Sequence, residues 1–260
     1  MPPEYHCVQP PIVYRIHYGT DPLTLRDWKA ATVTDRLGNE MFGHRWDDPQ
    51  REFRSLYTSS TKVGACIEVL QDLLPKVSEL ARLQAIQRDT DEDLPDFGAL
   101  PESYFEHLHG CELGIAAGIP FLNVVDAQIV QAMRSELAAL ATRLGLPDVD
   151  VSTITGDIRE VTQAVARNIY AARYAGISSP SSLGSPYTNW TVFEDGHETN
   201  RLRVEMTLLK APVPLTFDDS DLIEALNVLG LRIEGQERLL RYEPEPIEEI
   251  PACPEERRTT

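Results

Sequence analysis

The order in which helical and extended patterns follow one another limits the fold class of this chain most strongly. Stretches with the 3.6-residue apolar spacing of helices are mixed with short apolar stretches typical of strands. A doubly wound parallel sheet would require a strict β-α-β order, and the chain does not follow one. The sequence therefore predicts an α+β fold, with a mixed sheet and flanking helices.

Three stretches carry the helical pattern most clearly. The first spans 62–74, follows a cluster of Ser and Thr that could cap it, and stops before a proline. The second is capped by Asp126 and ends at Gly145, a usual residue for a helix C-terminus. The third spans about 157–174, and a shorter helix is expected at 222–229. Each long helix presents one apolar face to a core.

Short apolar and β-branched stretches predict the strands. These stretches are 13–17, 53–57, 113–125, 190–193 and 202–210. The third is interrupted by Gly118 and Pro120, so it predicts one or two buried strands. The serine-rich stretch 178–182 is predicted to be a loop.

The patterns predict one main domain with appendages. Residues 1–11 are proline-rich and predicted to be a disordered lead-in, and 12–205 form the main domain. Within it, the charged and turn-rich stretch 84–110 is predicted to be a surface insertion. We expect 206–242 to be a C-terminal extension that packs on the domain. The Pro- and Glu-rich stretch 243–260 predicts a disordered acidic tail.

Charge and composition narrow the classes of partner. Hydrophobic residues make up 42% of the chain, enough for a sizeable core. The formal net charge is −17, so most of the surface should repel a phosphate backbone, and nucleic acid is not an expected partner. A small anionic ligand remains compatible with this charge, because it needs only a local group of arginines and backbone N–H donors.

The cysteines and termini predict a cytoplasmic protein without a metal. Four cysteines lie far apart with no C-x-x-C pair, which argues against a disulfide framework. The N-terminus lacks the pattern of a signal peptide, and no apolar run reaches the roughly 20 residues of a membrane span. The cluster His107, His109 and Cys111 lacks a fourth ligand, so we expect no zinc site.

A set of short motifs occurs in a fixed order. The motifs are Arg45-Trp46, Leu56-Tyr57, Glu68, Phe121–Asp126, Thr162–Ala164, Gly176–Ser181 and Asn189. In this order and spacing, including a Glu eleven residues beyond the Tyr, the chain resembles the RES-domain family over about residues 12–194. The family is named for an arginine, a glutamate and a serine. The resemblance implies an ADP-ribosyltransferase-like fold that binds NAD, and it makes residues 12–205 the catalytic domain.

The resemblance also implies the site residues. The catalytic candidates are Glu68, Arg45, Tyr57 and Ser181. The NAD-binding candidates are Arg15, Arg45, Tyr57, Ser181 and Asn189. The loop contains the serines Ser178, Ser179, Ser181 and Ser182, and we align Ser181 with the functional serine because it follows a proline.

The chemistry of these residue types suits NAD cleavage. A planar, always-charged Arg45 or Arg15 can clamp a pyrophosphate. A carboxylate such as Glu68 stabilises the oxocarbenium character that develops on the ribose, and the small neighbours Gly64 and Ala65 would leave room for a ligand. The face of Tyr57 can hold the cationic nicotinamide ring, and the Ser181 hydroxyl can orient ribose or phosphate.

The resemblance implies an enzyme that cleaves the nicotinamide–ribose bond. The acceptor would be inorganic phosphate, which gives ADP-ribose-1-phosphate, or water. The family also implies a toxin that is held inactive by an antitoxin protein. One alternative is an ADP-ribosyltransferase that modifies a protein or small acceptor. A second is a non-catalytic nucleotide-binding or interaction module, against which the intact Arg, Tyr, Glu and Ser set argues. The oligomeric state is not readable from the sequence.

Overall fold

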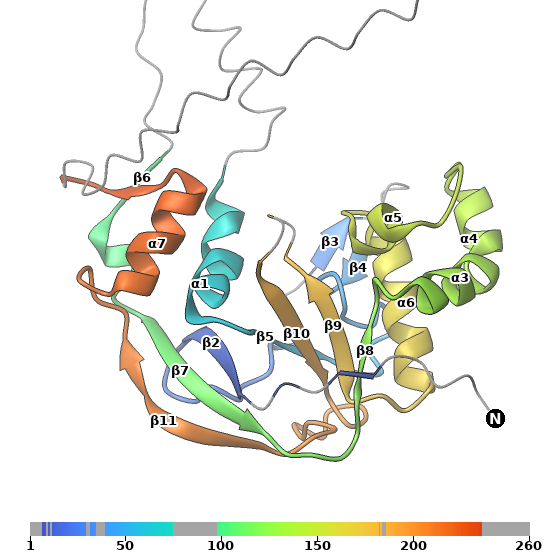
Figure 1. The fold of residues 1–260 in the computed structure, drawn as a ribbon, viewed down its shortest axis with the longest axis horizontal. Helices are drawn as coiled ribbons and strands as arrows, with labels where there is room; N and C mark the ends of the chain where they lie inside the picture. Colours follow the sequence, from blue (N-terminus) through green and yellow to red (C-terminus); the bar gives the residue numbers. More distant parts are fainter. Residues whose placement is uncertain are drawn as a thin grey trace, which may run out of the picture.

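The computed structural model describes residues 7–8, 10, 12–29, 32–34, 40–74, 98–181, 183 and 186–235. Its centre is an eight-stranded, mostly antiparallel sheet in the order β1-β8-β9-β10-β5-β2-β7-β11 (Figure 1). These strands are β1 (Cys7–Val8), β2 (Ile12–Tyr18), β5 (Ser55–Ser59), β7 (Leu108–Ile115), β8 (Phe121–Asn123), β9 (Gly176–Pro180), β10 (Thr188–Phe193) and β11 (Met206–Pro214). Two small sheets pair β3 (Thr32–Thr34) with β4 (Glu40–Phe42), and β6 (Ala99–Leu100) with β12 (Arg232–Ile233).

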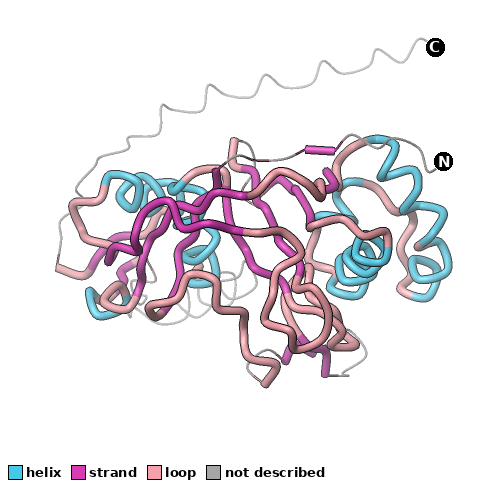
Figure 2. Tube along the Cα trace, turned by 90° about the horizontal axis from the view of Figure 1, so that it is seen from below, coloured by secondary structure: helices cyan, strands magenta, loops and turns pink. Residues whose placement is uncertain are grey.

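The helices form two groups, one on either side of β9 and β10 (Figure 1). The first group consists of α1 (Lys62–Leu70), which continues into the short 3-10 helix η1 (Gln71–Leu73), and α7 (Ser220–Leu229). The second consists of α3 (Ala127–Glu136), α4 (Ala138–Arg143), α5 (Val151–Thr155) and α6 (Arg159–Ala171). Figure 2 shows the same separation, with strands between the two groups of helices. Among the residues described, no helix is long and apolar enough to cross a membrane.

The register of the central strands places polar residues from three segments on one face. Asn189 in β10 pairs with Ser59 in β5 and with Ser179 in β9. Two residues further along β10, Thr191 pairs with Tyr57. Because directly paired residues of an antiparallel sheet point to the same side, these five side chains share one face of the sheet.

Both helical groups pack against this face, and a third core fills the opposite one. The α1–α7 core contains Ile16, Ile67, Leu70, Leu222 and Leu226. The α3–α6 core contains Ile129, Val161, Val165, Ile177 and Phe193. The core on the opposite face contains Val13, Leu56, Leu113, Trp190 and Val192. The polar row on β5, β9 and β10 therefore lies between two separate apolar cores.

The α+β class predicted from the sequence is confirmed, but one element is wrong. The serine-rich stretch expected to be a loop is β9, which pairs with β8 on one side and β10 on the other. Ser178 and Ser179 are almost fully buried there. Gly176 is needed in β9, since an added Cβ would lie 1.8 Å from the carbonyl oxygen of Thr191. Strand pairing thus overrides the loop preference of serine.

Other boundaries differ from the expected ones. The helix predicted to run unbroken to Gly145 is interrupted at Leu137, which separates α3 from α4. The strand β7 begins at Leu108, inside the predicted surface insertion. Residues 7–8, expected in a disordered lead-in, pair with β8 and cover what would otherwise be a sheet edge.

The C-terminal part of the predicted layout is described only to residue 235. Residues 206–214, expected to begin an extension, form β11 and pair with β7 in the main sheet. The predicted acidic tail 243–260 lies outside the described residues, as does 84–97 of the predicted insertion.

Candidate functional site

Glu68 on α1 is the centre of a hydrogen-bonded cluster that joins three segments of the chain. Its Oε1 accepts hydrogen bonds from Ser181 Oγ at 2.9 Å and from Asn189 Nδ2 at 2.7 Å. Its Oε2 accepts one from Gln71 Nε2 at 2.9 Å. Donors to an ionised carboxylate make stronger hydrogen bonds than neutral pairs do. The carboxylate is therefore fixed from both sides, and three of the predicted site residues meet at one point.

The packing of α1 on β5 sets the position of Glu68. The helix is capped by Thr61, whose Oγ1 accepts a hydrogen bond from Gly64 N at 3.0 Å. A Cβ at Gly64 would lie 2.3 Å from Ser59 Oγ, so the glycine permits a close approach of helix and strand. We expected the small residues beside Glu68 to leave room for a ligand. The space at Gly64 is instead filled by Ser59.

Among the serines of this stretch that the structure describes, Ser181 alone contacts Glu68. Ser181, the serine aligned with the family serine, follows β9 and reaches the carboxylate. Ser178 pairs with Trp190 and so points to the opposite face of the sheet. Ser179 lies on the Glu68 face next to Asn189, and Ser182 lies outside the described residues.

Tyr57 lies next to this cluster on the same sheet face. It is paired with Thr191, two residues from Asn189 and thus roughly 7 Å along the strand. Trp46 N donates to its phenol oxygen at 3.0 Å, and the His44 ring packs edge-on against it with 5.8 Å between centroids. Burial raises the pKa of Tyr57 well above its ordinary value, so the phenol is neutral at pH 7.

Two polar atoms between Glu68 and Tyr57 are not satisfied by described residues. The carboxamide oxygen of Asn189 and the hydroxyl of Thr191 are buried and have no hydrogen-bond partner there. Buried polar atoms without partners are uncommon in folded proteins. Their position in a row beside a fixed carboxylate suits a site for a polar ligand.

Arg45 lies in the loop that supports Tyr57. Its Nη2 contacts Asp157 Oδ1 at 3.2 Å, just before α6. The loop is held by buried Asp47, which accepts hydrogen bonds from His44 N at 2.7 Å and Ser55 N at 2.9 Å. Gln163 on α6 donates to the carbonyl oxygens of Phe42 and His44. The loop is therefore fixed to both β5 and α6. Arg45 belongs to the Tyr57 end of the site, where the residue it contacts is Asp157 rather than Glu68.

Arg15 is not brought to the Glu68 cluster. It pairs with Cys111, and its neighbour Val13 packs in the core of the opposite sheet face. The guanidinium donates to the carbonyl oxygens of Tyr57 at 3.0 Å and Thr24 at 3.3 Å. Burial lowers the pKa of Arg15 to about 10. Arg15 thus holds the backbone of Tyr57 from the opposite face of the sheet.

Sequence reasoning missed three residues of this region. Gln71 is three positions after Glu68, the spacing of neighbours on a helix surface, and this signal could have identified it. His44 and Arg159 gave no such signal. The pKa of His44 is lowered to about 4 by burial and by the charges of Arg26 and Arg159, so its imidazole is neutral at pH 7.

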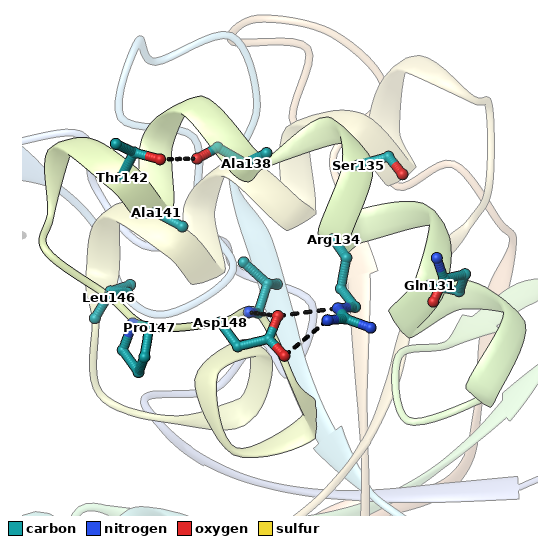
Figure 3. Close-up of a pocket in the computed structure, with 10 residues that line it drawn as sticks. Gln131, Arg134, Ser135, Ala138, Ala141, Thr142, Leu146, Pro147 and Asp148 are labelled. Carbon is teal, nitrogen blue, oxygen red and sulfur yellow. Dashed lines mark hydrogen bonds and ion pairs between the residues drawn. The ribbon is translucent and has the colours of Figure 1, made fainter.

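A hollow elsewhere on the surface contains none of these residues. It has a volume of about 430 Å³ and lies between α3, α4 and the segment to Val149 (Figure 3). The charged residues in its lining, Arg134 and Asp148, form an ion pair at 2.8 Å. Across the described parts of the chain, no group of three or more His, Cys, Asp or Glu side chains is arranged to hold a metal ion. The Glu68–Tyr57 region is therefore the candidate site.

Comparison with known proteins assigns the family. The RES domain matches residues 12–218, most of the chain. No curated protein matches. A chain of the M. tuberculosis MbcT–MbcA toxin–antitoxin complex is similar, with 17% identity, a TM-score of 0.36, and coverage of 76% of this chain and 84% of that one. The domain match confirms the resemblance seen in the motifs, and the chain belongs to the RES domain family.

Proposed function

We propose that this protein is an enzyme that acts on NAD and cleaves the bond between nicotinamide and ribose. Membership in the RES domain family supports NAD as the substrate. The observation that carries the proposal is the convergence of Ser181 and Asn189 on one oxygen of the Glu68 carboxylate. Both donors lie more than one hundred residues from Glu68 in the sequence, so the arrangement is a product of the fold rather than of local sequence.

A fixed carboxylate suits the chemistry of this bond. When the bond to nicotinamide breaks, positive charge develops on the ribose, and a nearby negative charge stabilises it. The stabilisation is greatest when the charged group is already in place before the reaction. Three hydrogen bonds hold Glu68 in place. In this proposal Glu68 is the main catalytic residue, and Ser181 and Asn189 orient both the carboxylate and the ribose.

The neighbouring residues suit the two ends of the bound molecule. The half-buried ring of Tyr57 provides an aromatic face for the cationic nicotinamide. The side chain of Arg45 has paired donors for a phosphate. Arg15 contacts the Tyr57 backbone and acts in this proposal through the position of that residue. No metal is required, because the bonding electrons pass to the pyridinium nitrogen and nicotinamide leaves as a neutral pyridine.

The acceptor and the biological role belong to the proposal as well. The acceptor is inorganic phosphate or water, with transfer of ADP-ribose to a protein or small molecule as the alternative. Family resemblance supports a cytoplasmic toxin that is paired with an antitoxin. A non-catalytic binding module is disfavoured, because a carboxylate held by three donors has no evident purpose in such a module.

Product analysis tests the proposal. Purified protein is incubated with NAD in buffers with and without inorganic phosphate, and the products are separated by chromatography. Phosphorolysis gives ADP-ribose-1-phosphate only when phosphate is present, and hydrolysis gives ADP-ribose in both buffers. Transfer requires an added acceptor. Intact NAD after prolonged incubation with folded protein and each acceptor would refute an enzyme of this class.

A further inference from the structure

We propose that Arg45 and Arg159 together form a phosphate-binding subsite at the start of α6. The ligand group is a phosphate, supplied either by the pyrophosphate of NAD or by inorganic phosphate. The inference rests on the proposed function for the identity of the ligand. It adds Arg159 to the site, a residue that neither the motifs nor the family match points to.

The two arginines come together although they are far apart in sequence. Arg45 Nη2 lies 3.2 Å from Asp157 Oδ1, and Asp157 is two residues before Arg159, the first residue of α6. Both arginines also act on Tyr57, because their charges partly offset the burial that raises the pKa of its phenol. The Arg45–Asp157 contact therefore places Arg45 and the first residue of α6 at the same end of the candidate site.

Neither arginine forms a buried ion pair with another residue that the structure describes. The side chain of Arg45 is only 19% exposed, yet its partner Asp157 is 98% exposed. Exposed carboxylates contribute little to an ion pair, so a ligand can displace this one at small cost. Arg159 is half-buried and makes no salt bridge with any residue that the structure describes. In contrast, Arg54 forms a buried pair with Glu194 at 2.6 Å.

The surroundings favour an anion of the size of phosphate. The paired donors of two arginines match the oxygen atoms of a phosphate. The nearby Asp47 does not compete, since its carboxylate accepts the backbone N–H groups of His44 and Ser55. The neutral ring of His44, beside Tyr57, can donate one further hydrogen bond. The first turn of α6 contains the acidic residue Glu160, so the positive charge of the subsite comes from the two arginines rather than from the helix end.

Titration of two probes tests the subsite without turnover. ADP-ribose and inorganic phosphate are titrated separately into the wild-type protein and the Arg159→Ala and Arg159→Lys variants by calorimetry. Arg143→Ala, which removes an exposed arginine on α4, is the matched control. Loss of a charged hydrogen-bond donor should weaken binding about tenfold to a hundredfold. Arg159→Lys should lie between wild type and Arg159→Ala, because lysine keeps the charge but loses the fork.

The two probes distinguish the sources of the phosphate. Weaker binding of ADP-ribose in Arg159→Ala assigns the subsite to the pyrophosphate of NAD. Weaker binding of inorganic phosphate alone assigns it to the acceptor. Unchanged affinity for both probes in a variant with the wild-type unfolding temperature overturns the inference, and so does absence of binding to the wild type. If ADP-ribose binding depends on Arg159 while NAD stays intact, the subsite stands and the proposed function fails.

Discussion

The two helical groups that cover one sheet face contribute side chains of different kinds to the candidate site. On the α1 side, both oxygens of Glu68 accept hydrogen bonds from protein donors. On the α6 side, Arg45 has one exposed partner and Arg159 has no salt bridge to a described residue. A carboxylate that is already held in place suits the reacting centre. Arginines without strong ion-pair partners suit the binding of an anionic ligand. The comparison predicts that substitutions on the α1 side change turnover and that those on the α6 side change affinity or stability.

The largest effect is expected for Glu68→Gln. The amide keeps the shape of the carboxylate but removes its charge, so kcat should fall by about 10²–10³ with little change in affinity. Steady-state NAD turnover measures this effect. Glu136→Gln, at an exposed position on α3, is the matched control and should retain wild-type turnover. Wild-type turnover by folded Glu68→Gln would show that the Glu68 carboxylate on α1 takes no part in the reaction.

A pH-dependent loss of stability is expected from His44 on the α6 side. Its pKa is lowered from 6.5 to about 4, so the unfolded chain binds more protons than the folded one between these values. The free energy of unfolding therefore falls as pH decreases through this range. At pH 4.5, protonation of His44 in the unfolded chain lowers the free energy of unfolding by about 2–3 kcal/mol. This loss disappears as the pH rises above 6.5.

Urea unfolding of wild type and His44→Gln at pH 4.5 and pH 7 isolates this contribution. Glutamine does not titrate, so the variant should lose less stability than the wild type when the pH is lowered. An identical pH dependence in the two proteins would show that His44 is already accessible for protonation in the folded state.

A smaller effect on binding is expected for Arg45→Lys. Lysine keeps the charge but loses the planar pair of donors, so NAD affinity should fall about tenfold. At saturating NAD, kcat should change little, which separates this variant from Glu68→Gln. Calorimetric titration of NAD into a slow Glu68→Gln background provides the affinity. Unchanged affinity would mean that Arg45 only fastens its loop to Asp157.

The smallest effect is expected for Gln71→Ala. Its amide holds the second oxygen of Glu68, so its loss should lower kcat about three- to tenfold, while KM stays nearly constant. Gln131→Ala on α3 is the control. A change in KM alone would contradict a positioning role, because an orienting donor affects the reacting carboxylate rather than the bound substrate.

The fold brings together three candidate residues that short sequence motifs point to. Glu68, Ser181 and Asn189 were each identified from short motifs, and the fold joins their side chains directly. Arg15 also had a motif, but strand alternation places it on the other sheet face.

Residues that depend on long-range contacts could not be predicted. Arg159 begins an amphipathic helix, where a charged residue is common and carries no functional signal of its own. Its importance follows from the approach of Arg45 to Asp157, a contact across 112 positions. The strand β9 was missed for the same reason, since its serines are buried only through pairing with β8 and β10.

The central claim is that the reacting ribose lies between Glu68 and Tyr57. A crystal structure of the slow Glu68→Gln variant with bound NAD tests this claim most directly. We expect the nicotinamide ribose within hydrogen-bond distance of the side chain at position 68, with the nicotinamide ring against Tyr57. We also expect the pyrophosphate toward the start of α6. NAD bound elsewhere, for example in the hollow between α3 and α4, would show that the ribose does not react between Glu68 and Tyr57.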